Sequence, residues 1–363
     1  MFTDRSSRPS QKGRGTVANP PNRFDQLHAE PFDVDVPYDD ERPAVRTMFL
    51  DDTSKSILAK NDSPDIPFTY SVNPYRGCEH GCIYCYARPS HEYLGFSAGL
   101  DFESKIMVKR RAPELLRRAL LAESWVPQAI EMCGNTDCYQ PVERALSLTR
   151  GCLQVLLALR NPVAIITKNQ LVTRDLDILR SLAELDLVHV TVSITTLDEV
   201  LARKMEPRTS TPLNRMRTVR TLSDAGVPVS VSVAPVIPGL TDEEIPSILR
   251  MASEYGASSA TYSVLRLPGA VEQLFLSWLD ELMPDRAQKI LSRIRTIREG
   301  HLNDSRFGKR MVGEGTMAEL IGDLFAVNAR KFGLDKPRKK LDTGKFNGKS
   351  SPQLGLFDEP KSS

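Results

Sequence analysis

The sequence lacks any apolar run close to the roughly 20 residues that a membrane-spanning helix requires. Its first residues contain no apolar core of a signal peptide, and six cysteines are too few for a disulfide framework in 363 residues. The formal net charge of +2 is too small to indicate a nucleic-acid partner by itself. These absences predict a cytoplasmic protein with reduced thiols and no membrane partner. Hydrophobic residues make up 40% of the chain, enough for a core of one large or two ordinary domains.

Three cysteines in one short stretch carry the strongest chemical signal. Cys78, Cys82 and Cys85 occur in the string Cys-Glu-His-Gly-Cys-Ile-Tyr-Cys, so one tight loop can point three thiolates at a common centre. Soft thiolates select iron–sulfur clusters, zinc or copper(I). A cubane cluster usually takes four cysteines, so three would leave one iron open for chemistry. The alternatives are a zinc knuckle, for which His80 is the fourth ligand at hand, and a structural disulfide.

From about residue 68, short β-branched runs alternate with helical periods. The predicted strands are 68–72, 128–133, 162–167, 188–195, 228–234 and 258–265. Between them, 143–159 reads as one amphipathic helix, and Thr241 with Glu244 reads as a capping box at a helix start. Strands that alternate with helices predict a parallel sheet covered by helices, and six units predict an open barrel with its chemistry at the carboxyl ends of the strands.

The remaining segments differ in character from this barrel. Residues 1–45 are rich in Pro, Arg, Asp and Ser without a helix or strand period, which predicts a disordered arm. We expect the barrel to span 46–268, a C-terminal helical extension to span 269–334, and a basic disordered tail to span 335–363.

The string from Asn73 to Ala87, with its aromatic residue before the third cysteine, resembles the signature of the radical S-adenosylmethionine (SAM) superfamily. Together with Met205-Glu206-Pro207-Arg208 and the segments after the second, third and fifth strands, it resembles the branch often called DNA repair photolyase-like. That branch is related to spore photoproduct lyase, and the resemblance covers roughly residues 45–330. It implies an α/β fold with a partial (β/α)6 barrel of the TIM-like type. It also implies a 4Fe–4S cluster on Cys78, Cys82 and Cys85, SAM as the second cofactor, and a reductant such as flavodoxin or ferredoxin.

In this superfamily the open iron holds the amino and carboxylate groups of SAM, and the reduced cluster cleaves SAM to a 5′-deoxyadenosyl radical. The resemblance implies cofactor contacts from the strand ends and from the aromatic residues beside the last cysteine. The expected cofactor-binding residues are Tyr84, Tyr86, Gly134, Asn135, Thr136, Asp137, Lys168, Ser193, Arg208 and Ala234. The usual Gly-Gly-Glu after the second strand is absent, so Gly134–Asp137 would replace it. Each position has a plainer alternative, such as a polar turn, a surface lysine or a helix cap.

The other cysteines divide into two groups. Cys152 falls on the apolar face of a predicted helix and is expected in the core. Cys133 and Cys138 bracket the turn after the second strand, where a thiol can donate a hydrogen atom to a substrate radical. In spore photoproduct lyase a cysteine at the end of the second strand returns the hydrogen, which makes Cys133 the expected catalytic residue. An incidental buried cysteine is the alternative for both.

The tail contains an apolar peptide, Gln353-Leu354-Gly355-Leu356-Phe357. It resembles the peptide by which bacterial repair proteins dock on the DNA sliding clamp, and a chance apolar patch is the alternative. The sequence therefore favours a radical SAM enzyme (photoproduct lyase-like) that abstracts hydrogen from a substrate, with damaged or modified nucleic acid as the first hypothesis. Modification of a peptide or small metabolite is the second hypothesis, and a non-catalytic metal-binding module is the third.

Overall fold

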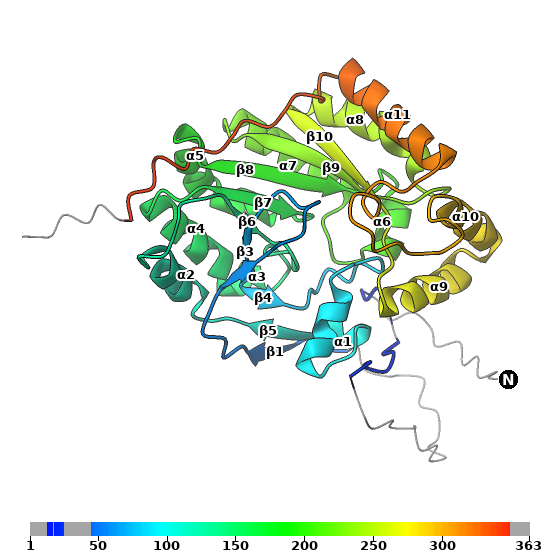
Figure 1. Ribbon diagram of the computed structural model, residues 1–363, viewed down its shortest axis with the longest axis horizontal. Helices are drawn as coiled ribbons and strands as arrows, with labels where there is room; N and C mark the ends of the chain where they lie inside the picture. The colour runs from blue at the N-terminus through cyan, green and yellow to red at the C-terminus, as the bar shows by residue number, and fades with distance from the viewer. Residues whose placement is uncertain (1–12, 17, 25–44, 349–363) are drawn as a thin grey trace, which may run out of the picture.

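The computed structural model describes residues 13–16, 18–24 and 45–348, which form an α/β fold around a seven-stranded sheet (Figure 1). Six strands are parallel and follow one another in chain order, and the antiparallel strand β2 (Leu58–Lys60) covers one edge. The parallel strands are β3 (Tyr70–Val72), β6 (Ile130–Met132), β7 (Val163–Thr167), β8 (Val188–Ile194), β9 (Val229–Val236) and β10 (Ser259–Val264). They overlap the six strands predicted from the sequence.

Helices fill the connections between these strands and cover the outer face of the sheet. They include α2 (Ala112–Leu120), α4 (Leu148–Ala158), α5 (Leu176–Glu184), α7 (Pro212–Asp224) and α8 (Ile245–Glu254). Within the described residues, the edge strands β2 and β10 share no ladder, so the barrel stays open on that side. The prediction of a six-unit partial barrel is confirmed.

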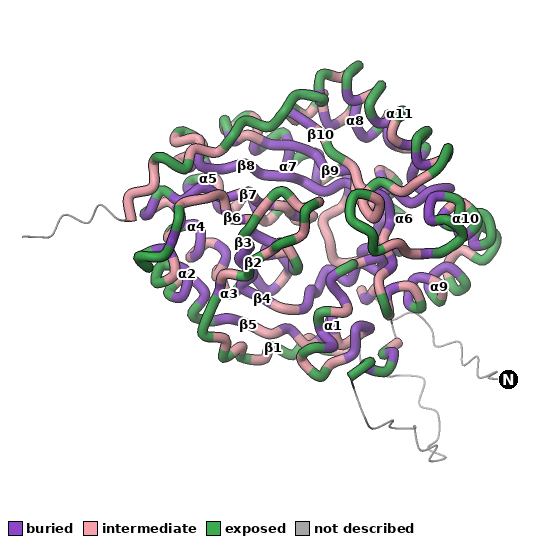
Figure 2. The backbone as a smooth tube through the Cα atoms, viewed as in Figure 1, coloured by how far each residue is buried: buried purple, intermediate pink, exposed green. Residues whose placement is uncertain are grey.

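The two faces of the sheet differ sharply in chemistry. The face against the helices is made of aliphatic side chains in one continuous core, and the strands are largely buried (Figure 2). The strand registers place a second set of residues on the opposite, concave face, and most of these are polar. They are Ser71, Glu131, His189, Thr191, Ser193, Ser230 and Ser232. A concave face of this kind suits a polar ligand better than a second hydrophobic layer.

Glu131 gives this face a measurable pH signature. Burial raises its pKa to about 7 from the ordinary 4.5, so the folded state holds the proton more tightly than the unfolded chain. Stability is then lost as pH rises from about 4.5 to 7. We expect Glu131→Gln to be more stable than the wild type at pH 8, by at most about 3 kcal/mol, and to lose that advantage toward pH 4.5. Urea unfolding at pH 5 and pH 8 measures this, with the exposed Glu184→Gln as control. An equal difference at both pH values would contradict it.

A small second sheet, which the sequence did not indicate, flanks the barrel near the cysteine loop. Its strands are β1 (Met48–Asp51), β5 (Lys105–Val108) and β4 (Tyr75–Arg76), in that order. The short helix α1 (Leu100–Ser104) leads directly into β5. Strand β4 ends at Arg76, two residues before Cys78. This sheet therefore fixes where the cysteine loop begins.

The C-terminal part packs on both the barrel and the cysteine loop. Helices α9 (Ala270–Leu282) and α10 (Pro284–Thr296) share a second core with Cys82, Ile83 and Tyr84. Helix α11 (Thr316–Lys331) packs against α8 and β10. Within the described residues no helix has both the length and the apolar character needed to cross a bilayer.

Two parts of the segments expected to be disordered are placed by the structure. Residues 335–348 run back along the barrel, where the Asp342 and Asn347 backbone amides donate to the carbonyls of Asp186 and Leu159. Residues 13–16 lie against the cysteine loop, as described below, and residues 18–24 contact the segment 92–101, where Asn22 donates to the Glu92 carbonyl (2.8 Å) and Leu100 donates to the Ala18 carbonyl (2.9 Å). The rest of the arm (1–12, 17 and 25–44) and the end of the tail (349–363), including the predicted clamp peptide at 353–357, lie outside the described residues.

Two local predictions were wrong. Residues 143–159 form two helices, α3 (Glu143–Leu146) and α4, because Ser147 adopts a left-handed backbone between them. Thr241 and Glu244 do not form a capping box. The Thr241 hydroxyl accepts from the Ile237 amide, and the Glu244 carboxylate accepts from Thr196 and the Leu197 amide. Thr241 therefore bonds to the residue that follows β9, and Glu244 bonds to residues that follow β8. Neither side chain caps a helix start.

Candidate metal and cofactor site

The cysteine motif forms one buried loop between β4 and the short 3-10 helix at Arg88–Leu94. Cys78, Cys82 and Cys85 are all free thiols, and none of the three forms a disulfide. Gly77 and Gly81 have positive φ angles of 82° and 69°. A Cβ atom at Gly77 would lie 2.9 Å from the Phe102 carbonyl, so only glycine fits this turn.

Hydrogen bonds hold the loop from several sides. The Cys78 amide donates to the Phe102 carbonyl (2.9 Å), and the Ile83 amide donates to the Met205 carbonyl (2.9 Å). Arg88 donates to the Cys82 carbonyl (3.0 Å) and forms a fully buried ion pair with Glu103 of α1. These contacts leave the loop little freedom, so its thiols are presented in a fixed arrangement.

The donor set fits an iron–sulfur cluster. Burial raises the pKa of the Cys78, Cys82 and Cys85 thiols, and the neighbouring thiols add to the effect at Cys78. Neutral thiols are therefore favoured until a cation replaces their protons, as in metal sites where binding releases protons. Both ring nitrogens of His80 face other residues, with Nδ1 3.4 Å from Asp137 and Nε2 3.1 Å from Asn169. His80 is therefore not positioned as the fourth ligand that a zinc knuckle would require.

Residues 13–16 of the N-terminal segment lie on this loop. Arg14 donates to the Glu103 carbonyl (2.6 Å), and the Gly15 amide donates to the Glu103 carboxylate (2.9 Å). A Cβ atom at Gly15 would lie 1.7 Å from the Gly81 carbonyl oxygen. The segment therefore packs against the cysteine loop at backbone contact distance, a role that the sequence did not suggest.

Lys168, Ser193 and Ala234 were predicted from three different strand ends, and the structure brings them together. The Lys168 ammonium donates to the Ser193 hydroxyl (2.7 Å), the Thr195 hydroxyl (3.1 Å) and the Ala234 carbonyl (3.1 Å). Its nitrogen is also 3.7 Å from the buried carboxylate of Glu206. The carboxyl ends of β7, β8 and β9 thus position the Lys168 ammonium group near the cysteine loop.

The two tyrosines and Arg208 are placed differently from one another. Tyr84 is buried, and its hydroxyl contacts Thr195 (3.1 Å) and Glu206, so it belongs to the Lys168 group. Tyr86 is 50% exposed and donates to the Gly134 carbonyl (2.5 Å). Arg208 pairs with Glu79 (3.3 Å), a residue of the cysteine loop, and does not join Lys168.

The turn after β6 is tied to the ends of its neighbouring strands. Asn73, which follows β3, accepts through its side chain from the amides of Asn135 (3.2 Å) and Thr136 (3.3 Å). Asp137 accepts from the Thr167 hydroxyl (2.8 Å) and the Lys168 amide (2.8 Å). Burial alone would raise the pKa of Asp137, but His80 and the hydrogen bonds from the Lys168 and Tyr139 amides hold it below its ordinary value. Asn135 alone of the predicted Gly134–Asp137 set is exposed.

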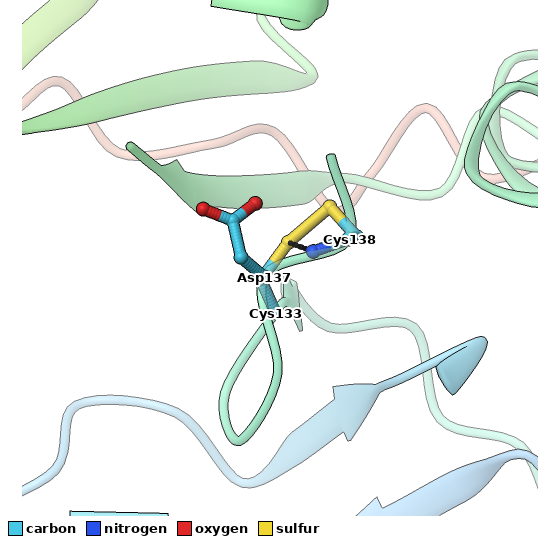
Figure 3. Close-up of side chains that lie close together, drawn as sticks. All are labelled: Cys133, Asp137 and Cys138. Atoms are coloured by element: carbon cyan, nitrogen blue, oxygen red, sulfur yellow. Dashed lines mark hydrogen bonds between the residues drawn. A yellow bond between two sulfur atoms is a disulfide. The ribbon is translucent and has the colours of Figure 1, made fainter. Parts of the chain in front are cut away.

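The largest departure from the sequence interpretation concerns Cys133. Its sulfur is bonded to Cys138, and the pair lies beside Asp137 (Figure 3). In this state the Cys133 sulfur carries no hydrogen, so a donor role requires the reduced pair. Cys152 is a free, fully buried thiol in the main core, as predicted.

Sequence reasoning missed several residues that organise the site. Glu206 connects Tyr84, Lys168 and the buried Arg215, and Glu103 connects Arg88 with the N-terminal segment. Glu206 belongs to the Met205–Arg208 string described above, but the sequence gives no signal of which residues a single buried carboxylate contacts. Glu103 had no signal because no helix or strand period relates it to Arg88, 15 residues earlier, or to Gly15, 88 residues earlier.

Comparisons with known proteins agree with this geometry. A profile of the Radical SAM superfamily matches residues 72–252. An uncharacterized protein of Mycobacterium tuberculosis is 38% identical over 246 residues, which cover 67% of this chain and 71% of that protein. An uncharacterized protein of Methanocaldococcus jannaschii is 29% identical over 175 residues, covering 48% of this chain and 63% of the other.

Solved structures with the same fold include spore photoproduct lyase. Its complex with dinucleoside spore photoproduct superposes with a TM-score of 0.56 at 16% identity, covering 78% of this chain and 79% of that one. A variant with bound S-adenosylmethionine and dinucleoside spore photoproduct gives a TM-score of 0.54 at 16% identity, covering 78% of each chain. At this identity the likeness establishes the fold.

Proposed function

Because this chain belongs to the radical SAM superfamily, we propose that it abstracts hydrogen from damaged or modified nucleic acid and returns a hydrogen atom from Cys133. The superfamily uses a 4Fe–4S cluster and SAM, which together supply the abstracting radical. In this chain, Cys78, Cys82 and Cys85 would hold the cluster. Lys168 is the cation best placed for the SAM carboxylate, with Ser193 and Ala234 orienting its ammonium group.

The position of Cys133 is the observation that carries the proposal. It follows β6, which pairs with β3, and Asp137 of the same turn contacts His80 inside the cysteine loop. The carboxyl ends of parallel strands are where barrels of this kind do their chemistry. A sulfur at that point is well situated to meet a substrate radical.

One side-chain pair near the end of β10 supports a nucleic-acid substrate. The Arg266 guanidinium lies 5.6 Å from the ring centre of half-exposed Tyr86, and it makes no salt bridge within the described residues. Exposed aromatic rings stack on bases, and guanidinium groups bind phosphates. The exposed ring of Phe307 is a second candidate for stacking, but the Arg310 guanidinium 4.8 Å from it is already paired with Asp65.

The reaction class and the substrate are tested together by isotope transfer. After anaerobic cluster reconstitution, lesion-bearing DNA with deuterium at the reacting carbon should yield deuterated 5′-deoxyadenosine. Deuterium transferred instead from a labelled peptide or metabolite would favour the second hypothesis. An intact cluster that never cleaves SAM would indicate a non-catalytic module.

A variant of Cys133 separates abstraction from hydrogen return. Cys133→Ala should still cleave SAM, because it leaves the cysteine loop intact. Product should fall and radical side-products should accumulate, because the substrate radical still forms but has lost its positioned hydrogen-atom donor. Product analysis by mass spectrometry measures this. An unchanged product distribution would return Cys133 to a structural role.

Two partners complete the proposal. A one-electron carrier of the flavodoxin or ferredoxin class would reduce the cluster. Docking on a DNA sliding clamp through Gln353, Leu354, Leu356 and Phe357 remains a prediction from the sequence, and the basic residues before that peptide would favour DNA electrostatically.

A further inference from the structure

Cys138 has no role in the chemistry described so far, yet the structure bonds it to Cys133. The two Cα atoms are 5.3 Å apart, and both residues are buried, with 6% and 0% exposure (Figure 3). The Cys138 amide also donates to the Cys133 sulfur (3.2 Å). The second sulfur is therefore held against the proposed hydrogen donor.

The surroundings of the pair are rigid without the sulfur–sulfur bond. The Thr149 hydroxyl donates to the Cys138 carbonyl (2.7 Å), and Asn73 fixes the amides of Asn135 and Thr136 in the intervening turn. A bond closing so short a loop is not needed to hold this turn. The three cysteines nearby must also be reduced to bind a cluster, so the site works under conditions in which disulfides are usually transient, catalytic or redox-sensing.

The backbone at Cys133 adopts an uncommon conformation, as it does at Ser147, Arg160, Asp186 and Glu299. Its φ angle is +84°, a conformation that non-glycine residues rarely adopt. Such positions cluster at active sites, where the surrounding structure enforces them. Here the Cys133 amide donates to the Val72 carbonyl (3.2 Å) beside β6, and the Cys133 sulfur accepts from the Cys138 amide.

We propose that Cys133 and Cys138 form a redox-active dithiol in which Cys138 captures the thiyl radical left on Cys133. This inference rests on the proposed hydrogen-return function. First, the Cys133 S–H bond breaks and its hydrogen atom forms a C–H bond on the substrate radical. The Cys133 thiyl then joins the Cys138 sulfur, whose proton is released to water. One ligand atom from each of Cys133, Asp137 and Cys138 lies within 4.8 Å of the others.

The resulting disulfide radical anion loses one electron to an oxidised carrier of the flavodoxin or ferredoxin class, which leaves the neutral disulfide. A dithiol reductant must then restore the pair by exchange, supplying two electrons and two protons. The protein therefore needs two kinds of reductant: a one-electron carrier and a dithiol. Because both cysteines are buried, a small-molecule dithiol can reach the pair more easily than a protein reductant.

The test uses the cluster-loaded full chain and needs no known substrate. The pair is first reduced with dithiothreitol, which is then removed, and the protein is incubated in D₂O with SAM and half-reduced flavodoxin. Without a substrate, the weak S–D bond of Cys133 is the expected hydrogen source. We expect deuterium in 5′-deoxyadenosine and one Cys133–Cys138 disulfide for each molecule formed, measured by alkylation and peptide mass spectrometry.

Variants separate the steps. Cys138→Ser should still form deuterated 5′-deoxyadenosine but no disulfide, and Cys133→Ala should lose most of the deuterium. Cys152→Ser, which removes a buried thiol elsewhere, should behave as the wild type. Formation of 5′-deoxyadenosine without the disulfide would overturn the dithiol proposal alone, whereas no 5′-deoxyadenosine at all would overturn the proposed function.

A second measurement does not depend on turnover. In cluster-free protein, alkylation after dithiothreitol treatment should label Cys133 and Cys138 together, and glutathione disulfide should restore their bond reversibly. A pair that resists dithiothreitol in the folded protein would be a structural disulfide and would contradict the proposal.

Discussion

Replacing Cys78, Cys82 or Cys85 by alanine should abolish the visible iron–thiolate absorption of the reconstituted protein and reduce SAM cleavage to background. The cluster needs all three thiolates, because His80, the histidine inside the loop, is committed to Asp137 and Asn169. Iron analysis and ultraviolet–visible spectroscopy after anaerobic reconstitution measure the loss.

Cys152→Ala is the matched control for these variants. It also removes a buried free thiol, but from the core between α4 and the sheet. It should lower the unfolding free energy while iron content and absorption stay at the wild-type level. Anaerobically purified wild type that contains zinc and no iron would contradict the assignment of the metal centre.

The barrel could be predicted because its signals are local. Each buried strand is a short β-branched run, and alternation with helices leaves few other arrangements. The cysteine loop could also be predicted, since its three ligands lie within eight residues of one another. Lys168, Ser193 and Ala234 were found because parallel strands end at the same edge of a sheet.

The rest depends on contacts between distant residues. Thr241 and Glu244 have the spacing of a capping box, but Thr241 accepts from the Ile237 amide and Glu244 bonds to Thr196, 48 residues earlier. The bond between Cys133 and Cys138 was missed because the prevalence of reduced thiols in cytoplasmic proteins argued against it. Gly15 contacts Gly81 across 66 positions of sequence, which no local pattern reveals.

The ion pair between Arg88 and Glu103 should be the strongest single support of the cysteine loop. Both side chains are fully buried, and Arg88 also donates to the carbonyls of Cys82 and Gly99. Arg88→Met would leave the Glu103 carboxylate buried without its cation, which costs on the order of 3–5 kcal/mol. We expect unfolding at correspondingly lower denaturant concentration and incomplete iron incorporation.

A double-variant cycle distinguishes the pair from general loop packing. Arg88→Met with Glu103→Leu should recover part of the lost stability, because no unpaired charge remains in the interior. Recovery should be incomplete, since Glu103 also accepts from the Gly15 amide (2.9 Å). Arg203→Met, which removes an exposed pair with Glu199, should change stability by no more than about 0.5 kcal/mol. If Arg88→Met proved as mild as Arg203→Met, the loop would owe its geometry to its backbone hydrogen bonds and to the core it shares with α9 and α10.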